Sequence, residues 1–351
     1  MANHVVIMAG GIGSRFWPIS TPEYPKQFID ILGIGRSLLQ LTYDRFVSSI
    51  IPNQNVWVVT NAKYVDIVQN QLPNIPHDNI LAEPTSRNTA PCIAWACWSI
   101  RKKDSCANVV VTPADAIVMN TVEFNRVIEN SLHFTEESNS ILTIGIKPTR
   151  PETGYGYVQA ANIIKGEIHR VIAFKEKPNY KTAQAYLALG NFLWNAGIFV
   201  WNVNTITNAI IKYKPTIAEA MDKIIATGDI DTIFPTCEKI SIDYAVIEPA
   251  AVDGCVYTHP ASFGWSDLGN WQSLHEIIHK DKNHNSATGN VHLFECYNCV
   301  IHAENAQQII LQGLDNYIVA EKNGRFLVCR RSAEQHINEF STQSTILNTP
   351  H

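Results

Sequence analysis

Short apolar runs alternate with helical patterns through the first half of the chain. The apolar runs are rich in Val and Ile, as is typical of buried strands. The expected strands are residues 4–9, 55–60, 79–82, 108–112 and 140–146. The expected helices between them are residues 37–49, 62–71, 89–103 and 122–137. This alternation predicts βαβ units, a mainly parallel sheet flanked by helices, and a ligand site at the carboxyl ends of the strands.

From about residue 150 the pattern is mixed. The segments "TGYGYVQAA", "IHRVIAFKEKP" and "WNAGIFVWNV" predict further strands. Further helices are expected over residues 179–189, 204–212, 216–226 and about 270–280. The expected fold class is therefore α/β.

The end of the chain has a different pattern. Residues 279–290, "HKDKNHNSATGN", are polar and suit a linker. Short β-like runs with frequent turn residues follow, so we interpret residues 288–331 as a small β-rich unit. We expect a main domain over residues 1–280, and a linker with a small β-rich C-terminal domain over residues 281–351.

Composition limits the class of partner. The chain has 351 residues, of which 46% are hydrophobic and 17% charged, so we expect a compact protein. Its net charge is −5 and it has no basic run, which argues against a nucleic-acid partner. No stretch approaches the roughly 18 apolar residues of a membrane span, and we find no signal peptide. We therefore expect a cytoplasmic protein with no membrane partner.

The eight cysteines are scattered along the chain, which favours reduced thiols. One stretch, "VHLFECYNCVIH", holds four residues of types that bind zinc: His292, Cys296, Cys299 and His302. The flanking residues are apolar and strand-like, however, with no loop to fold four ligands around an ion. We favour ordinary strand thiols and histidines.

The segment "VVIMAGGIGSRFWPISTPEYPKQF", residues 5–28, places closely spaced glycines directly after a strand. A dinucleotide-binding loop would need a third glycine where Phe16 stands, and a helix that the prolines at 18, 22 and 25 forbid. A Walker A loop would need the dipeptide "GK", which does not occur in the chain. A kinase glycine loop would be followed by HRD and DFG motifs, which are missing.

What remains is a glycine turn followed by a long, proline-stiffened loop that carries Arg15 and Lys26. Glycines let backbone N–H groups approach phosphate oxygens, and the two cations suit phosphate charge. A glycine-rich turn with a solvated Arg and Lys explains the composition of this loop about equally well.

Other segments place charged residues at predicted strand ends. "VVVTPADA" places Asp115 there, and "FKEKP" places Glu176 and Lys177. "FGWSDLGNW" places Asp267 in a turn. Asp115 and Asp267 are candidate ligands of Mg²⁺, which takes one or two carboxylates plus substrate phosphates and water. Each aspartate alone also suits a turn or a helix N-cap, most seriously Asp267.

Together these residues describe a site for nucleotidyl transfer. In this reaction a phosphate oxygen attacks the α-phosphorus of a nucleoside triphosphate, and pyrophosphate leaves in line. The nucleophile is already an anion near neutral pH, so positioning and charge cancellation suffice. The chain accordingly shows no G-x-S-x-G nucleophile motif and no HExxH zinc motif.

At this point the glycine loop resembles the signature of the sugar-phosphate nucleotidylyltransferases, GG-x-G-x-R…PK. The Trp-Pro after the arginine and the "KQF" ending resemble its mannose-1-phosphate guanylyltransferase (GDP-mannose pyrophosphorylase) branch. Further blocks are similar to that branch, in order: "AEPTSRNTAP", "VTPAD", "TRPETGYGYV", "FKEKP", "WNAGIFVW", "SIDYAVIE" and "WSDLGNW". The resemblance runs from residue 5 to about residue 271.

The resemblance implies a Rossmann-like sheet of the nucleotide-diphospho-sugar transferase type, with residues 1–280 as the catalytic domain. It also implies the reaction of GTP with α-D-mannose 1-phosphate to give GDP-mannose and pyrophosphate, with Mg²⁺ as cofactor. Carried over by position, the triphosphate residues are Gly10, Gly11, Gly13 and Arg15, with Lys26 near the α-phosphate. Glu83 and Asn88 lie near guanine, and Asp115 and Asp267 bind the metal. The sugar-phosphate residues are Gly156, Glu176, Lys177 and Asn195.

The chain departs from the branch at one position, where many members have "PADH" and this chain has "PADA". Ala116 thus replaces a histidine, and activity could differ if that histidine helps to place metal or phosphate. The tail is similar to the family's β-rich C-terminal unit. Because the chain ends soon afterwards, we expect it to lack the extra domain of bifunctional relatives that also isomerise mannose 6-phosphate.

Three alternatives stay open: a different sugar 1-phosphate, a different base, or a catalytically silent nucleotide-sugar-binding regulator. The presence of the whole charged set, Arg15, Lys26, Asp115, Lys177 and Asp267, argues against the silent regulator. Strand edges in the β-rich tail, together with family analogy, lead us to expect a homodimer.

Overall fold

The structure is a computed structural model that describes residues 1–47, 50–175, 177–304, 306 and 308–347. Its contacts divide the chain into two compact units, each built from separate stretches of sequence. The first unit comprises residues 1–10, 42–114 and 118–265. The second comprises residues 11–41, 115–117 and 266–351. The sequence predicted two domains that are continuous in the chain and meet at residue 280, and this boundary stays a prediction.

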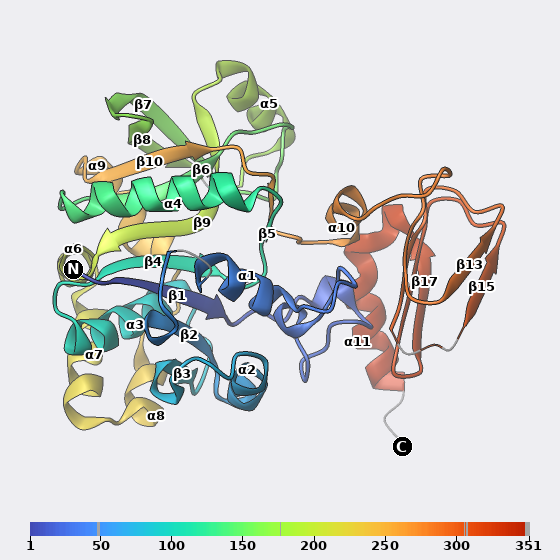
Figure 1. Ribbon diagram of the computed structural model, residues 1–351, viewed down its shortest axis with the longest axis horizontal. Helices are drawn as coiled ribbons and strands as arrows, with labels where there is room; N and C mark the ends of the chain where they lie inside the picture. The colour runs from blue at the N-terminus through green and yellow to red at the C-terminus, as the bar shows by residue number, and fades with distance from the viewer. Residues whose placement is uncertain (48–49, 176, 305, 307, 348–351) are drawn as a thin grey trace. The chain divides into compact units, whose positions relative to one another are not determined.

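A nine-stranded mixed sheet forms the centre of the first unit, with the strand order β3-β2-β1-β4-β9-β6-β10-β8-β7 (Figure 1). The strands are β1 (Asn3–Ala9), β2 (Val56–Asn61), β3 (Ile80–Glu83), β4 (Asn108–Pro113), β6 (Ile141–Ile146), β7 (Tyr157–Lys165), β8 (Ile168–Lys175), β9 (Phe192–Asn202) and β10 (Val256–Ala261). Strands β1 to β4 pair in parallel, as does β6 with β10. Strand β9 runs antiparallel to β4 and β6 and joins these two parallel blocks.

Helices cover both faces of this sheet. They are α1 (Leu38–Val47), α2 (Val65–Gln71), α3 (Thr89–Lys103), α4 (Thr121–Glu136), α5 (Tyr180–Leu189), α6 (Val203–Tyr213), α7 (Pro215–Thr227), α8 (Ile230–Ile233) and α9 (Glu248–Val252). On one face, α3, α6 and α7 form a single core with β1, β2 and β4. On the other, Phe124 of α4 packs edge-on against Phe46 of α1 and Phe263. Because both faces are covered, a central strand such as β4 is buried at every position from Asn108 to Thr112, with three consecutive valines in its middle.

The helix predicted over residues 89–103 is confirmed, including its signals. Asn88 is the N-cap of α3 and its side chain accepts a hydrogen bond from the backbone N–H of Thr89. The other predicted elements of the first half lie within about three residues of their predicted ends. Strand β10 was missed, because its sequence "VYTHPA" mixes polar residues and a proline into a buried strand. Thr258 and His259 are nevertheless fully buried there.

The second unit combines the glycine loop with the β-rich end of the chain. Its elements include the one-turn helices η1 (Ser14–Phe16) and η2 (Lys26–Phe28), helix α10 (Trp271–Ile277) and helix α11 (Ile337–Leu347). Its strands are β12 (Ser286–Thr288), β13 (Val291–Phe294), β14 (Val300–Ala303), β15 (Ile309–Gln312), β16 (Tyr317–Lys322) and β17 (Arg325–Arg330). The β-rich character predicted for the C-terminal region is confirmed.

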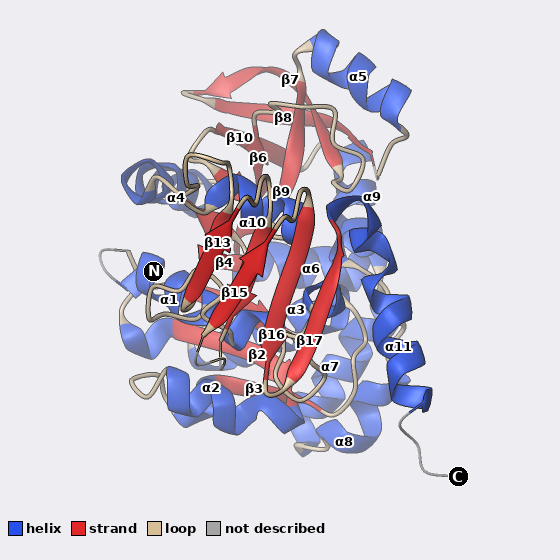
Figure 2. Cartoon of the chain, turned by 90° about the vertical axis from the view of Figure 1, so that its right-hand side faces the viewer, coloured by secondary structure: helices blue, strands red, loops and turns tan. Residues whose placement is uncertain are grey.

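The strands of this unit form two small sheets. One has the order β12-β14-β16-β17, and the other pairs β13 with β15. Pairing is parallel except between β16 and β17, which lie side by side in Figure 2. Phe16 and Ile19 of the glycine loop share one core with Trp271 and with Val300 and Ile318 of the sheet. The glycine loop is therefore held by apolar burial against the far end of the sequence.

Cys296 and Cys299 are buried in this β-rich unit. The thiol of Cys296 lies 3.4 Å from the carbonyl oxygen of Phe294, and that of Cys299 lies 3.2 Å from the carbonyl oxygen of Tyr297. Burial raises the pKa of the Cys299 thiol and lowers the pKa of His302. Within the described ranges, no group of three or more His, Cys, Asp or Glu side chains that could by itself hold a metal ion is found. None of the helices among the described residues is both long and apolar enough to span a membrane.

Candidate active site

The glycine loop of the second unit closes on Lys26. Gly13 has a φ of +70°, and a Cβ added there would lie 2.5 Å from the Cβ of Lys26, so only glycine fits. The backbone N–H of Lys26 donates to the carbonyl oxygen of Ile12, and the Ser20 hydroxyl donates to the same oxygen. A Cβ added at Gly10 or Gly11 would meet nothing within 4 Å, so a ligand can approach the backbone there.

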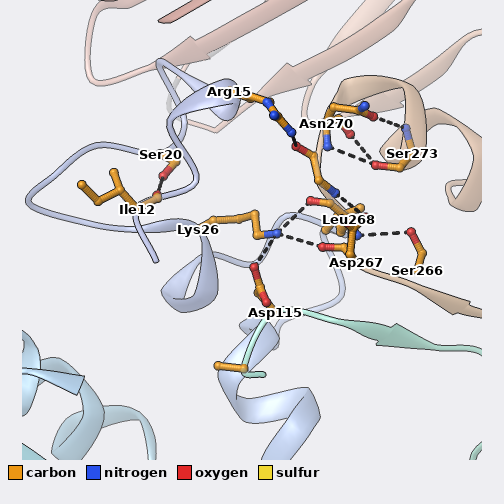
Figure 3. Close-up of polar contacts among 12 residues, drawn as sticks. Ile12, Arg15, Ser20, Lys26, Asp115, Ser266, Asp267, Leu268, Asn270 and Ser273 are labelled. Carbon is orange, nitrogen blue, oxygen red and sulfur yellow. Dashed lines mark hydrogen bonds and ion pairs between the residues drawn. The ribbon is translucent and has the colours of Figure 1, made fainter. Parts of the chain in front are cut away.

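Lys26 is the centre of a cluster of oxygen atoms (Figure 3). Its ammonium nitrogen lies 2.7 Å from Oδ2 of Asp115. It also donates to the carbonyl oxygens of Asp267, at 3.1 Å, and Leu268, at 2.8 Å. These three partners match the three N–H donors of a lysine. Only 5% of the Lys26 side chain is exposed, so the ammonium depends on these contacts in place of water.

Residues 267–269 present their backbone carbonyl oxygens to the glycine loop. The Leu268 side chain is fully buried in the core that contains Phe16, while its backbone has a φ of +45°. The guanidinium of Arg15 reaches the carbonyl oxygen of Gly269 at 3.4 Å. In return, the indole N–H of Trp271 donates to the carbonyl oxygen of Arg15 at 3.0 Å. Arg15 itself is exposed, so its charge is accessible to a ligand.

The two candidate metal ligands have different surroundings. Asp115 follows β4, pairs with Lys26, and leaves 38% of its side chain exposed. Oδ1 of Asp267 accepts a hydrogen bond from the backbone N–H of Gly269. This contact is typical of a turn aspartate, the alternative interpretation of Asp267 from the sequence. The structure thus brings Lys26, Asp115 and the backbone of Asp267 together.

The residues predicted near the base lie in the first unit. Glu83 ends β3 and is 6% exposed, and its Oε1 is a buried oxygen with no hydrogen-bond partner among the described residues. Burial raises the pKa of Glu83 to about 7, against a smaller lowering by the neighbouring Cys92 thiol. Asn88 caps α3 with a positive φ of 67°. This arrangement combines a desolvated carboxyl group and an amide near one helix N-terminus.

The predicted sugar residues also lie in the first unit. The backbone N–H of Asn195, on β9, donates to the carbonyl oxygen of Gly156 at 2.8 Å, which joins two of them directly. Lys177 is exposed just after β8. Glu176 lies outside the described residues. The structure therefore connects Gly156 with Asn195 and places Lys177 on the surface near a strand end.

One polar residue in this region was not singled out by the sequence. Asp243 accepts a hydrogen bond from the side-chain amide of Asn195 at 3.0 Å. It begins a π-helical turn, Asp243–Ile247, within the block "SIDYAVIE". A π turn has no simple sequence signature, and an acid at the start of a helix is ordinary. Only its position beside Asn195 marks it.

Comparison with known proteins identifies the family. The model of the nucleotidyl transferase family matches residues 4–284. The chain belongs to this family. The family that the sequence motifs predicted is therefore confirmed, and the chain is a nucleotidyltransferase.

Individual relatives are similar over nearly the whole chain. A mannose-1-phosphate guanylyltransferase of Escherichia coli is 34% identical over 348 residues, which cover 95% of this chain and 73% of that protein. One of Salmonella montevideo is 35% identical over 350 residues, with 95% and 72% covered. A solved structure described as mannose-1-phosphate geranyltransferase of Thermus thermophilus has a TM-score of 0.90 at 27% identity. It covers 98% of this chain and 100% of that one.

Nucleotidyl transferases typically use a divalent metal ion, and Asp115 and Asp267 are the residues of the second unit that would hold one together with substrate phosphates and water. Asp115 and Asp267 come from separate segments that meet at the Lys26 ammonium, Asp115 through its carboxylate and Asp267 through its backbone carbonyl oxygen. All the donors around this position are hard oxygens, the type that Mg²⁺ prefers. Ala116, where many members of the guanylyltransferase branch have histidine, is buried beside Asp115.

Proposed function

We propose that this nucleotidyltransferase transfers GMP from GTP to α-D-mannose 1-phosphate, giving GDP-mannose and pyrophosphate. The observation that carries the proposal is the cluster of Lys26, Asp115 and residues 267–268, because it gathers lysine and carboxylate charge at the end of a glycine loop. The similarity to a mannose-1-phosphate guanylyltransferase covers 95% of this chain, and it supports the choice of substrates.

The triphosphate would be held by the glycine loop. The backbone at Gly10, Gly11 and Gly13 offers space and N–H groups to phosphate oxygens, and Arg15 adds an exposed guanidinium. Asp115 and Asp267 would hold Mg²⁺, which when bound neutralises phosphate charge.

The chemical step would need no general base. A phosphate oxygen of mannose 1-phosphate, already an anion, forms a bond to the α-phosphorus while the bond to the pyrophosphate oxygen breaks in line. Lys26 would balance charge at the α-phosphate. Because all three of its N–H donors already have partners, a phosphate oxygen must replace one of these oxygens when GTP binds.

Glu83 and Asn88 would recognise the base. Guanine presents an N1–H and an amino group side by side, and a carboxylate can accept a hydrogen bond from each of them. Adenine has no N1–H, so a buried acceptor such as Oε1 of Glu83 favours guanine. Gly156, Asn195 and Lys177 would serve the sugar phosphate, together with Glu176.

We also propose that the protein works as a homodimer in the cytoplasm. The open edges of the small sheets in the β-rich unit support self-association. Light scattering after gel filtration would test this, and a monomeric mass at micromolar concentration would refute it.

The decisive experiment measures pyrophosphate release by the purified chain with GTP, mannose 1-phosphate and Mg²⁺. We expect turnover with these substrates, and at least about 100-fold less with Asp115→Asn, which keeps the shape of the side chain but loses its charge. Near-normal turnover of Asp115→Asn would refute its role as a metal ligand. A panel of other nucleoside triphosphates and sugar 1-phosphates tests the substrate alternatives. Tight GDP-mannose binding without pyrophosphate release would favour the silent regulator.

A further inference from the structure

The side-chain amide of Asn195 has an orientation that its neighbours determine. One end of the amide faces the backbone N–H of Gly197 at 3.1 Å, and an N–H can only donate, so the atom facing it is the acceptor Oδ1. The Thr143 hydroxyl lies 3.2 Å from the same oxygen. The Nδ2 end then faces Oδ1 of Asp243 at 3.0 Å, where the carboxylate accepts. The contacts at both ends of the amide therefore agree.

This orientation determines what Asn195 offers to a ligand. The two lone pairs of Oδ1 serve Gly197 and Thr143, and one of the two N–H donors of Nδ2 serves Asp243. Its second N–H is the group that the amide can direct to a ligand. A carboxylate accepts several hydrogen bonds at once, so Asp243 can serve Asn195 and a further donor together. The pair thus presents one donor beside one charged acceptor.

Asp243 is held in this position from two directions. Asn195 reaches it from β9, whose backbone is joined to Gly156. On the other side, the backbone N–H of Ile242 donates to the Thr89 hydroxyl at 2.9 Å, and the N–H of Ala90 donates to the carbonyl oxygen of Ile240 at 3.1 Å. Asp243 is therefore tied to the start of α3, which Asn88 caps. Both Asp243 and Asn195 are half-buried, so they are fixed by the fold and still accessible.

We propose that Asp243 and Asn195 together bind two neighbouring hydroxyl groups of the sugar, and that Asp243 is a residue that determines sugar specificity. A vicinal diol matches this pair, because one hydroxyl oxygen can accept from the Asn195 N–H while the adjacent hydroxyl donates to the carboxylate. A charged acceptor also discriminates strongly, since a sugar that lacks the hydroxyl takes water from the carboxylate without returning a hydrogen bond to it. This inference rests on the proposed function and names the groups of the sugar that its site recognises.

The test compares ligands that differ only by the sugar. Calorimetry gives the dissociation constants of GDP-mannose and GDP for the wild-type chain and for Asp243→Asn. An asparagine at this position can still accept from Asn195, so the local hydrogen bond is kept while the charge is removed. The matched control is Asp253→Asn, an exposed aspartate of the first unit that pairs with Lys212.

We expect Asp243→Asn to weaken GDP-mannose binding about 10- to 100-fold, the loss typical of one hydrogen bond to a charged group, and to change GDP binding less than about twofold. In turnover, KM for mannose 1-phosphate should rise while KM for GTP is unchanged. The control should behave as wild type in every measurement.

Two outcomes would overturn the inference while leaving the proposed function intact. In one, Asp243→Asn binds GDP-mannose as tightly as the wild type does. In the other, it loses GDP and GDP-mannose affinity equally, which would show a general structural role. A different result would refute the proposed function itself. In that case the wild-type chain would bind GDP-mannose no more tightly than GDP and would release no pyrophosphate.

Discussion

Replacing Lys26 by methionine tests whether its oxygen cluster stabilises the second unit. Methionine keeps most of the length and volume of the side chain but removes the charge and all three donors. The change leaves the Asp115 carboxylate without its ammonium partner at 2.7 Å, and the carbonyl oxygens of Asp267 and Leu268 without their donor. Lys282→Met, at an exposed lysine of the same unit, is the matched control.

The expected loss follows from the exposure of each partner. Breaking a buried ion pair by removing one partner costs about 3–5 kcal/mol, but Asp115 is 38% exposed and regains water. The bond to the Leu268 carbonyl is buried, and losing a hydrogen bond to a charged group there costs about 1.5–3 kcal/mol. We therefore expect Lys26→Met to lower the free energy of unfolding by about 2–4 kcal/mol, and Lys282→Met by less than about 0.5 kcal/mol.

Urea unfolding of both variants, with Asp115→Asn and the double variant, measures these values and the coupling between Lys26 and Asp115. Hydrogen exchange of the Leu268 and Gly269 amides shows whether the loss is local, since these amides should exchange faster in Lys26→Met. A variant within about 0.5 kcal/mol of wild type, with unchanged exchange, would refute our account of Lys26 as a bound cation that holds this unit together.

Three further predictions concern pH, backbone and metal. Burial raises the pKa of Glu83 from 4.5 to about 7, so the unfolded chain releases this proton at lower pH than the folded chain does. Stability should therefore fall by up to about 3 kcal/mol as pH rises from 4.5 to 7 and then level off, and urea midpoints of Glu83→Gln should lack this fall. Gly13→Ala should cost at least about 1–2 kcal/mol in urea unfolding and lower turnover, because its Cβ meets Lys26 and its φ is +70°. An equally stable Gly13→Ala would show that the loop readjusts freely. Chelation with EDTA should abolish pyrophosphate release and added Mg²⁺ should restore it, whereas activity that survives chelation would exclude a metal requirement.

The sequence predicted the elements whose signals are local. Helix α3 has a cap, a proline in its first turn and a basic end, so its bounds were predicted correctly at Thr89 and Lys103. Strand β10 has no such signal, because Thr258 and His259 are buried only through their neighbours in the sheet. Its position depends on pairing with β6, which lies more than 100 residues earlier in the chain.

In the candidate site, too, the sequence predicted the features with local signals and missed those that depend on the folded chain. Residue types and strand ends were enough to choose Lys26, Asp115 and Asp267, and the structure brings these segments together. The carbonyl oxygen of Leu268 could not be predicted, because it depends on a backbone with φ of +45° that only the folded core imposes. Asp243 was missed for a related reason, since its link to Asn195 joins segments 48 residues apart through a π-helical turn.

The core that joins the glycine loop to the β-rich end of the chain has a consequence for synthesis on the ribosome. Leu268, which accepts a hydrogen bond from Lys26, lies 242 residues further along the chain. At about 5–20 residues per second, tens of seconds separate the appearance of the two halves of this cluster. During that interval the core of Phe16 and Ile19 is incomplete, since it includes Trp271 and Val300. The nascent chain therefore exposes its glycine loop to chaperones and proteases until the last third of the protein has been made.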